Sequence, residues 1–176
     1  MIYFTSDWHL NHKNILHLSQ RPFKSIEEMK EVMLENINTV TSRKSDKLFM
    51  LGDMTFGDKD GLLDFINKIH VPVFIVSGNH DANNMCNFLR RNGVNVLPKG
   101  SFSFMKGDLK ITLSHKPIDS RYLVKDEFNI CGHKHSKGGK LLSPQHYDCG
   151  VDNNNFYPVS LSDILHKRKI YNRYRF

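Results

Sequence analysis

The sequence predicts an α/β fold built on a mostly parallel sheet. Three short β-prone runs in the first half alternate with stretches whose apolar residues recur at helical spacing. Each of these runs ends in a loop that carries polar side chains. This alternation predicts parallel strands joined by right-handed crossovers, with the loops after the strands gathered along one crevice.

The first half is expected to hold three strands separated by helices. The first helix follows Ser25, which forms a capping box with Glu28, and it runs to about Thr41. A loop with one helical turn over residues 13–18 precedes this helix. The three strands are expected at Ile2–Ser6, Lys47–Leu51 and Val71–Val76.

Two further helices are expected in this half. Asp60 is expected to cap a helix over Leu62–Ile69. A third helix over Ala82–Asn92 is expected to end at Gly93, which adopts the left-handed conformation at low cost. The order of elements is therefore strand, helix, strand, helix, strand, helix.

Beyond residue 94, short strands and turns replace this alternation. The runs Phe102–Lys106 and Leu109–Leu113 flank Gly107 and Asp108, which predicts a hairpin. A strand is expected at Phe128–Cys131. The remaining expected elements are short strands at Leu141-Leu142, His146–Asp148 and Val159, and a modest helix over Leu161–Lys167.

The bulk composition is that of a globular protein. The 176 residues suit one domain, residues 1–176, with 39% hydrophobic and 24% charged residues. No segment approaches the roughly twenty apolar residues that a membrane span needs, and no secretory signal opens the chain. The cysteines Cys86, Cys131 and Cys149 are odd in number and scattered, which argues against disulfides and favours a cytoplasmic location. The oligomeric state stays open.

A formal net charge of +7 is compatible with an anionic ligand, a nucleic-acid surface or a soluble basic protein. Much of the excess lies in the tail. We favour a solvated basic face there and keep nucleic-acid binding as an alternative. The tail cations are Lys167, Arg168, Lys169, Arg173 and Arg175.

Five expected strand ends present side chains that bind metal ions. They carry carboxylate, amide and imidazole groups without sulfur, a set that suits divalent metals such as Mn²⁺, Fe²⁺ or Zn²⁺. Two metal ions about 3.5–4 Å apart need a bridging ligand, and Asp53, alone on its glycine loop, is the natural bridge. The side chains are Asp7 and His9, Asp53, Asn79 and His80, His115, and His133 and His135.

These blocks resemble, in order and rough spacing, those of the calcineurin-like metallophosphoesterases. The resemblance spans residues 7 to 135, and five blocks in order are far more specific than any one alone. Flanking segments resemble the small stand-alone bacterial and phage members. The blocks are Asp7-x-His9, Gly52-Asp53, Gly78-Asn79-His80-Asp81, Ser114-His115 and Gly132-His133-x-His135.

The resemblance implies a four-layer α/β/β/α sandwich in which mixed sheets are flanked by helices and a dinuclear metal site lies at the strand ends. Two divalent metal ions are implied, with Mn²⁺ expected first and Fe²⁺, Zn²⁺, Ni²⁺ or Mg²⁺ as alternatives. One ion would be held by Asp7, His9, Asp53 and His135, and the other by Asp53, Asn79, His115 and His133.

The implied reaction is hydrolysis of a phosphate ester by metal-activated hydroxide. The resemblance makes His80 the acid that protonates the leaving oxygen, and Asp81 is expected to orient a neighbouring group. The residues after the first block have two equally supported roles, contact with substrate phosphate or a place in a solvated loop. They are His12, Lys13 and Arg21.

Three functions follow as hypotheses. A two-metal phosphoesterase leads, with diester hydrolysis slightly favoured over monoester hydrolysis. The second is a nuclease or an enzyme that processes nucleic-acid ends and uses the basic tail, with a nucleotide or nucleic acid as partner. The third is a catalytically silent scaffold of the same fold, which the presence of every block, His80 included, argues against.

Overall fold

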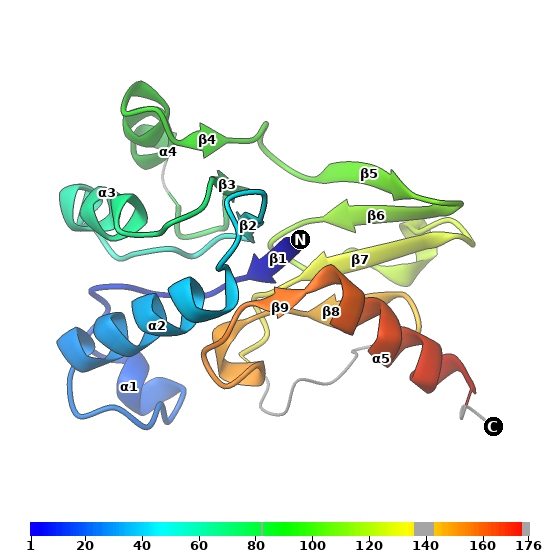
Figure 1. Ribbon diagram of the computed structural model, residues 1–176, viewed down its shortest axis with the longest axis horizontal. Helices are drawn as coiled ribbons and strands as arrows, with labels where there is room; N and C mark the ends of the chain where they lie inside the picture. The colour runs from blue at the N-terminus through cyan, green and yellow to red at the C-terminus, as the bar shows by residue number, and fades with distance from the viewer. Residues whose placement is uncertain (82, 136–142, 174–176) are drawn as a thin grey trace.

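The computed structural model describes residues 1–81, 83–135 and 143–173 (Figure 1). Its strands form two sheets that pack face to face, and helices flank them. This arrangement agrees with the predicted α/β class.

The first sheet is mostly parallel, as the sequence predicts. Strands β1 to β4 pair in parallel, and β9 pairs antiparallel with β1 at one edge. The two-residue strand β4 was not foreseen. In spatial order the strands are β4 (Asn95–Val96), β3 (Val73–Ile75), β2 (Lys47–Met50), β1 (Ile2–Thr5) and β9 (Val159–Ser160).

The second sheet combines a hairpin with parallel pairs. The predicted hairpin forms between β5 and β6, whereas β6, β7 and β8 run parallel. The expected strand at Leu141-Leu142 lies outside the described residues. The strands, in spatial order, are β5 (Phe102–Lys106), β6 (Leu109–Leu113), β7 (Glu127–Cys131) and β8 (His146–Asp148).

Four α-helices cover the outer face of the first sheet, while the second sheet packs on its inner face (Figure 1). The fifth helix, α5, is longer than predicted. The helices are α1 (Ile15–Leu18), α2 (Ile26–Val40), α3 (Lys59–Asn67), α4 (Asn83–Arg91) and α5 (Leu161–Arg173), with 3₁₀ turns at Ser120–Tyr122 and Val151–Asn153.

The helix starts show which caps form. The Ser25 side chain accepts a hydrogen bond from the N–H of Glu28, as predicted. The prediction for α3 is wrong, because Asp58, not Asp60, is its cap. The extended backbone of Asp58 lets its carboxylate accept from the N–H of Gly61, while Asp60 lies inside the first turn.

Two apolar clusters make up the core. One lies between the first sheet and helices α1 to α4, and it includes the buried Trp8. The other lies between the sheets, where Phe4 and Leu51 meet Phe128 and Tyr147. Alternate residues of β1 and β2 therefore belong to different clusters, which fixes the register of the first sheet.

Helix α5 packs its buried Leu161 and Ile164 into the cluster between the sheets. Because β9 is antiparallel to β1, the helix starts beside the first residues of β1 and runs away from α1 (Figure 1). In the second sheet, Thr112 donates to Glu127, and Asn129 Oδ1 accepts the N–H of Ile118 from the loop after β6. No described helix is both long and apolar enough to cross a membrane.

Candidate metal centre

The loops after β1, β2 and β3 meet at one edge of the first sheet. The N–H groups of Asp7 and His9 donate to the carbonyls of Gly52 and Asp53, each at 3.0 Å. A Cβ added at Gly52 would lie 2.5 Å from the Cα of Gly78, so only glycine allows the second and third loops to approach this closely. The glycines before Asp53 and Asn79 therefore bring the polar side chains together.

Five of the predicted ligands have left-handed backbone conformations. Non-glycine residues rarely adopt positive φ, and such conformations cost about 1–3 kcal/mol each where they occur. Strain of this kind gathers at functional sites because the surrounding structure holds it there. The residues are Asp7 (φ 61°), His9 (50°), Asp53 (56°), His133 (75°) and His135 (46°).

The ligand side chains converge in two clusters. Asp7, His9 and His135 form one, and Asp53, His115 and His133 form the other, with the ligand atoms of each cluster within 4.8 Å of one another. In the first cluster the Nε2 atoms of His9 and His135 lie 3.2 Å apart. In the second cluster, His115 Nε2 lies 3.1 Å from His133 Nδ1.

Asp53 lies between the two clusters. Its Oδ2 atom lies 3.2 Å from His115 Nε2 in its own cluster and 3.7 Å from His9 Nε2 in the other. Its Oδ1 atom accepts the N–H of His80 at 3.0 Å. This position is the one that the sequence predicts for a bridging carboxylate.

Hydrogen bonds behind two of the histidines fix which nitrogen faces the centre. His115 Nδ1 lies 2.8 Å from the Leu51 carbonyl, which has no proton, so Nδ1 carries the hydrogen. His135 Nδ1 lies 2.8 Å from Asp152 Oδ2 and likewise donates. Both Nε2 atoms are then left with a lone pair toward the centre, as metal-binding histidines require.

Burial and neighbouring charges set the protonation of the centre. Burial, together with the facing His135 ring, lowers the pKa of His9 to about 3, so this imidazole is neutral with a free lone pair. Burial alone would raise the pKa of Asp53, but the neighbouring His115 imidazole and the N–H of His80 outweigh it and bring the pKa to about 2. Asp53 is therefore an anion at neutral pH.

The residues present fit a divalent metal ion. Asp7 Oδ1 is buried and has no hydrogen-bond donor among the described residues, while Oδ2 accepts the N–H of His133 at 2.9 Å. A buried carboxylate oxygen without a donor is costly. A cation held with His9 and His135 would satisfy it, and the donors are the oxygen and imidazole atoms that such ions prefer.

Asn79 and His80 lie on different walls of the centre. Asn79 lines a pocket of about 240 Å³ with His115, Lys99 and Lys116. His80 lines a second pocket of about 220 Å³, and its ring is 54% exposed, with Nε2 4.0 Å from Asp53 Oδ2. The imidazole of His80 is therefore open to a ligand that reaches the centre.

Asp81 holds the loops rather than facing a ligand. Its carboxylate accepts the N–H groups of Gly78 at 2.7 Å, Asp53 at 2.8 Å and Met54 at 3.0 Å. These bonds tie the third loop to the second. Asp81 therefore orients neighbouring residues by accepting from their backbone N–H groups, and within the described residues it makes no hydrogen bond to the side chain of a ligand.

Arg21 lies in neither of its two expected settings, contact with substrate phosphate or a solvated loop. Its guanidinium is fully buried, donates to both carboxylate oxygens of Asp152 at 2.8 and 2.9 Å, and donates to the carbonyls of Asp7 and Trp8. All of its strong donors point into the protein. Asp152 in turn accepts from His135 Nδ1, a role that no pattern in the sequence indicates.

The two other expected substrate contacts lie near the first cluster in different settings. The His12 ring lies 5.8 Å from the His9 ring and is half-buried. Lys13 is exposed and makes no ion pair among the described residues. The structure thus brings His12, and not Arg21, to the edge of the centre.

The fold and the two clusters define a dinuclear metal centre in a mixed α/β sandwich. A family model described as calcineurin-like phosphoesterase matches residues 1–152. An uncharacterized protein of Methanocaldococcus jannaschii is 30% identical over 174 residues, covering 93% of this chain and 89% of that protein. The chain therefore belongs to the calcineurin-like phosphoesterase family, whose members hydrolyse phosphoesters at two divalent metal ions.

Two solved structures are similar. A protein of unknown function from Aquifex aeolicus superposes with a TM-score of 0.73 at 26% identity, covering 94% of this chain and 98% of that one. A structure described as a novel archaeal phosphodiesterase gives a TM-score of 0.50 at 13% identity, over 86% and 83% of the two chains. The second likeness shows a shared fold.

Proposed function

We propose that this protein is a dinuclear-metal-dependent phosphoesterase that favours phosphodiesters over phosphomonoesters. The observation that supports it best is the position of Asp53, whose Oδ2 lies within 4 Å of imidazole nitrogens from both clusters. A single carboxylate between two ligand sets is the arrangement that a pair of metal ions requires.

The residues divide into two ligand sets that share Asp53. Bound there, divalent ions lower the pKa of water and neutralise charge on a phosphate. Mn²⁺ is the first expectation for oxygen and imidazole donors. The first set is Asp7, His9, Asp53 and His135, and the second is Asp53, Asn79, His115 and His133.

His80 is proposed as the proton donor to the leaving oxygen. Its backbone N–H is held by Asp53, which fixes the residue, while its ring is half exposed and open to a ligand. An imidazole within hydrogen-bond reach of the leaving oxygen can act as the general acid of the reaction. Asp81 supports this position by binding the loop on which His80 lies.

The engagement of Arg21 within the protein is compatible with a diester substrate. Arg21, the one guanidinium expected near the phosphate, is fully engaged by Asp152 and by backbone carbonyls. A phosphodiester carries one negative charge where a monoester carries up to two, so it needs fewer cationic partners. The archaeal phosphodiesterase of the same fold is consistent with this preference.

The test compares turnover of bis-p-nitrophenyl phosphate with that of p-nitrophenyl phosphate in the presence of Mn²⁺. We expect faster metal-dependent turnover of the diester. Equal rates would overturn the diester preference, and the absence of turnover with both substrates would overturn the phosphoesterase proposal itself.

Replacement of the proposed acid sharpens this test. His80→Asn should lower kcat about 100- to 10,000-fold while metal binding, measured calorimetrically, stays close to wild type. His70→Asn is the matched control, because His70 is an exposed histidine that follows α3. An unchanged kcat in His80→Asn would remove the acid role.

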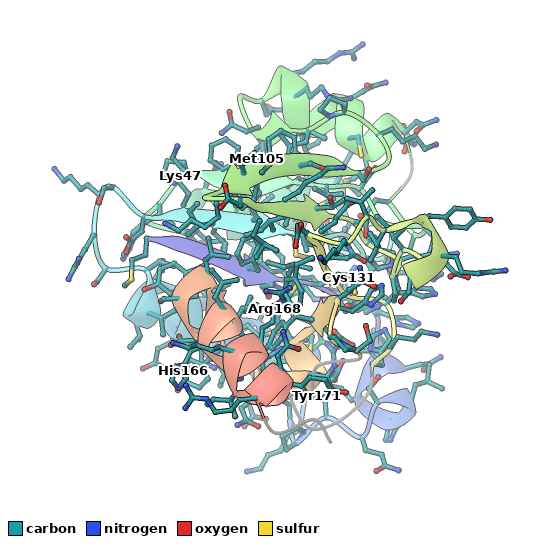
Figure 2. The ribbon with its side chains drawn as sticks, turned by 90° about the vertical axis from the view of Figure 1, so that its right-hand side faces the viewer. Lys47, Met105, Cys131, His166, Arg168 and Tyr171 are labelled. Atoms are coloured by element: carbon teal, nitrogen blue, oxygen red, sulfur yellow. The ribbon has the colours of Figure 1, made fainter. Side chains whose placement is uncertain are left out.

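The alternative that relies on the basic tail finds little support. Lys167 donates to the Tyr147 hydroxyl at 2.9 Å, and the Arg168 guanidinium lies 5.1 Å from the Phe128 ring centroid. Both cations therefore pack against the sandwich. Figure 2 shows His166, Arg168 and Tyr171 along α5, which starts at the end of β1 opposite the metal centre.

A further inference from the structure

An exposed aromatic ring lies next to the metal centre. Phe56 is on the loop after β2, and 60% of its surface is exposed. Its ring centroid lies 5.1 Å from that of His12, with an interplanar angle of 30°. The His12 ring lies 5.8 Å from His9, and the His9 ring lies 6.0 Å from His80. The four rings form an aromatic row from the proposed acid to the surface.

The position of Phe56 is fixed by its neighbours. Its N–H donates to the Leu10 carbonyl at 2.9 Å, and the hydroxyl of Thr55 donates to the same carbonyl at 2.6 Å. Phe56 belongs to neither apolar cluster of the described residues. A large ring is thus held firmly at the surface without packing into the core.

The backbone of His12 is hydrogen-bonded to His9 and Ile15, but its side chain has an atom that no described residue satisfies. Its Nδ1 atom is buried and has no partner among the described residues. The ring is instead flanked by His9 on one side and Phe56 on the other. Contact between rings therefore holds His12 at the edge of the metal centre.

A pocket adjoins the aromatic row. The residues on either side of Phe56, Thr55 and Gly57, line the pocket of about 220 Å³ that also holds His80. Asn84 lines the same pocket, and its Oδ1 accepts the N–H of Met85, which leaves the amide hydrogens free for a ligand. The pocket thus offers hydrogen-bond donors close to an exposed ring.

We propose that Phe56 and His12 form a stacking surface for a planar base, and that the substrate is a phosphate ester of a nucleoside. An exposed aromatic ring beside a phosphate-binding centre stacks any base, because every base has a π face. Asn84 then supplies polar contact to the base edge. The inference rests on the proposed phosphoesterase activity and adds the class of substrate.

Ligand binding tests the inference apart from turnover. Calorimetry on the Mn²⁺-loaded protein compares adenosine 5′-monophosphate with glycerol 3-phosphate, which carries the same phosphate without a base. We expect tighter binding of the nucleotide and, in Phe56→Ala, about a five- to tenfold rise in its Kd with no change for glycerol phosphate. Equal affinity of the wild-type protein for both ligands would overturn the inference.

Two variants act as controls. Phe56→Trp keeps a stacking ring and should retain wild-type or tighter nucleotide binding. Tyr171→Ala removes an exposed ring from α5 (Figure 2), a helix that starts beside the first residues of β1, opposite the metal centre, and it should leave the Kd unchanged. A dinucleotide in the same assay separates an oligonucleotide substrate, which would bind more tightly than the mononucleotide, from a mononucleotide substrate.

Turnover separates failure of this inference from failure of the proposed function. In Phe56→Ala, the KM for bis-p-nitrophenyl phosphate, itself an aromatic ester, should rise about fivefold with kcat nearly unchanged. If the wild-type protein turns the substrate over but Phe56→Ala changes neither the nucleotide Kd nor the KM, the phosphoesterase proposal is kept and the stacking surface is overturned. Absence of wild-type turnover would instead overturn the proposed function.

Discussion

Asp152 shows how one side chain can support a metal ligand from behind. It accepts a bond from His135 Nδ1 at 2.8 Å and both bonds of the Arg21 fork. Arg21 also donates to the carbonyl of Asp7, so two ligands of the first cluster are supported by one buried ion pair. A buried charge that loses its partner is strongly destabilising, which ties the pair to the integrity of the centre.

This network predicts a selective loss of metal affinity. Asp152→Asn keeps the shape of the side chain but removes the charge that holds the His135 N–H, so we expect one of two Mn²⁺ ions to bind about 10- to 100-fold more weakly. Titration calorimetry resolves the two binding steps. The step assigned to the second cluster should keep its affinity.

Asp64→Asn is the control for this prediction, because Asp64 pairs with Lys68 on the exposed face of α3. This variant should bind both ions as the wild-type protein does. Two unchanged binding steps in Asp152→Asn would contradict a positioning role for Asp152.

The sequence reveals ligands more readily than the residues that support them. Asp7 and His9 stand out because they end a β-prone run, and the carboxylates and imidazoles among the predicted ligands lie in two clusters. Arg21 and Asp152 are 131 positions apart, so their pairing depends on a fold-level contact that no local pattern encodes. For this reason Arg21 was assigned to substrate and Asp152 was not assigned at all.

At the scale of elements, the loop after β2 does more than connect a strand to a helix. It carries Asp53 at its start and Phe56 in its middle, and it ends at Asp58, the cap of α3. The carboxylate of Asp58 satisfies the N–H of Gly61, one of the free donors of the first turn. The helix start therefore fixes the far end of this loop.

A pair of substitutions tests which aspartate is the cap. Asp58→Ala should lower the free energy of unfolding by about 1 kcal/mol, because it leaves a helix donor without its partner. Asp60→Ala should change it by less than about 0.5 kcal/mol, since an acidic residue in the first turn contributes only through the helix dipole. Urea denaturation measures both, and an equal or larger loss in Asp60→Ala would contradict the assignment.

Element types were more predictable than their limits and partners. The capping box of α2 was visible in the sequence because Ser25 and Glu28 have the required spacing. Asp58 and Asp60 are both plausible caps by residue type, and only the backbone conformation decides between them. Strand β4 has two residues and no periodicity to detect, and the parallel pairing of β6 with β7 depends on a crossover loop.

At the scale of the whole molecule, α5 relates the basic tail to the sandwich. Its first turns bury Leu161 and Ile164 between the sheets, and Lys167 and Arg168 then extend over the rings of Tyr147 and Phe128. Long cationic side chains cover apolar surface with their stems while their charged ends stay near water. Two of the cations that contribute to the net charge of +7 therefore cover apolar side chains of the second sheet.

This role predicts different effects for two adjacent cations. Arg168→Ala should lower the free energy of unfolding by about 1 kcal/mol, because it removes packing on Phe128 and a hydrogen bond to the Pro144 carbonyl. Lys169→Ala, the matched control at an exposed position, should leave stability within about 0.5 kcal/mol of wild type. Chemical denaturation reports both values.

The same two variants test the tail against nucleic acid. Because α5 starts at the end of β1 opposite the metal centre, neither substitution should change turnover of bis-p-nitrophenyl phosphate. If instead a polynucleotide bound through the tail, each lost cation would reduce the slope of log affinity against log salt concentration by about one unit. Lys169→Ala would then reduce this slope as much as Arg168→Ala does. A smaller salt slope in both variants with unchanged stability would show that the tail binds nucleic acid. A loss of stability confined to Arg168→Ala would show instead that the tail stabilises the packing of the two sheets.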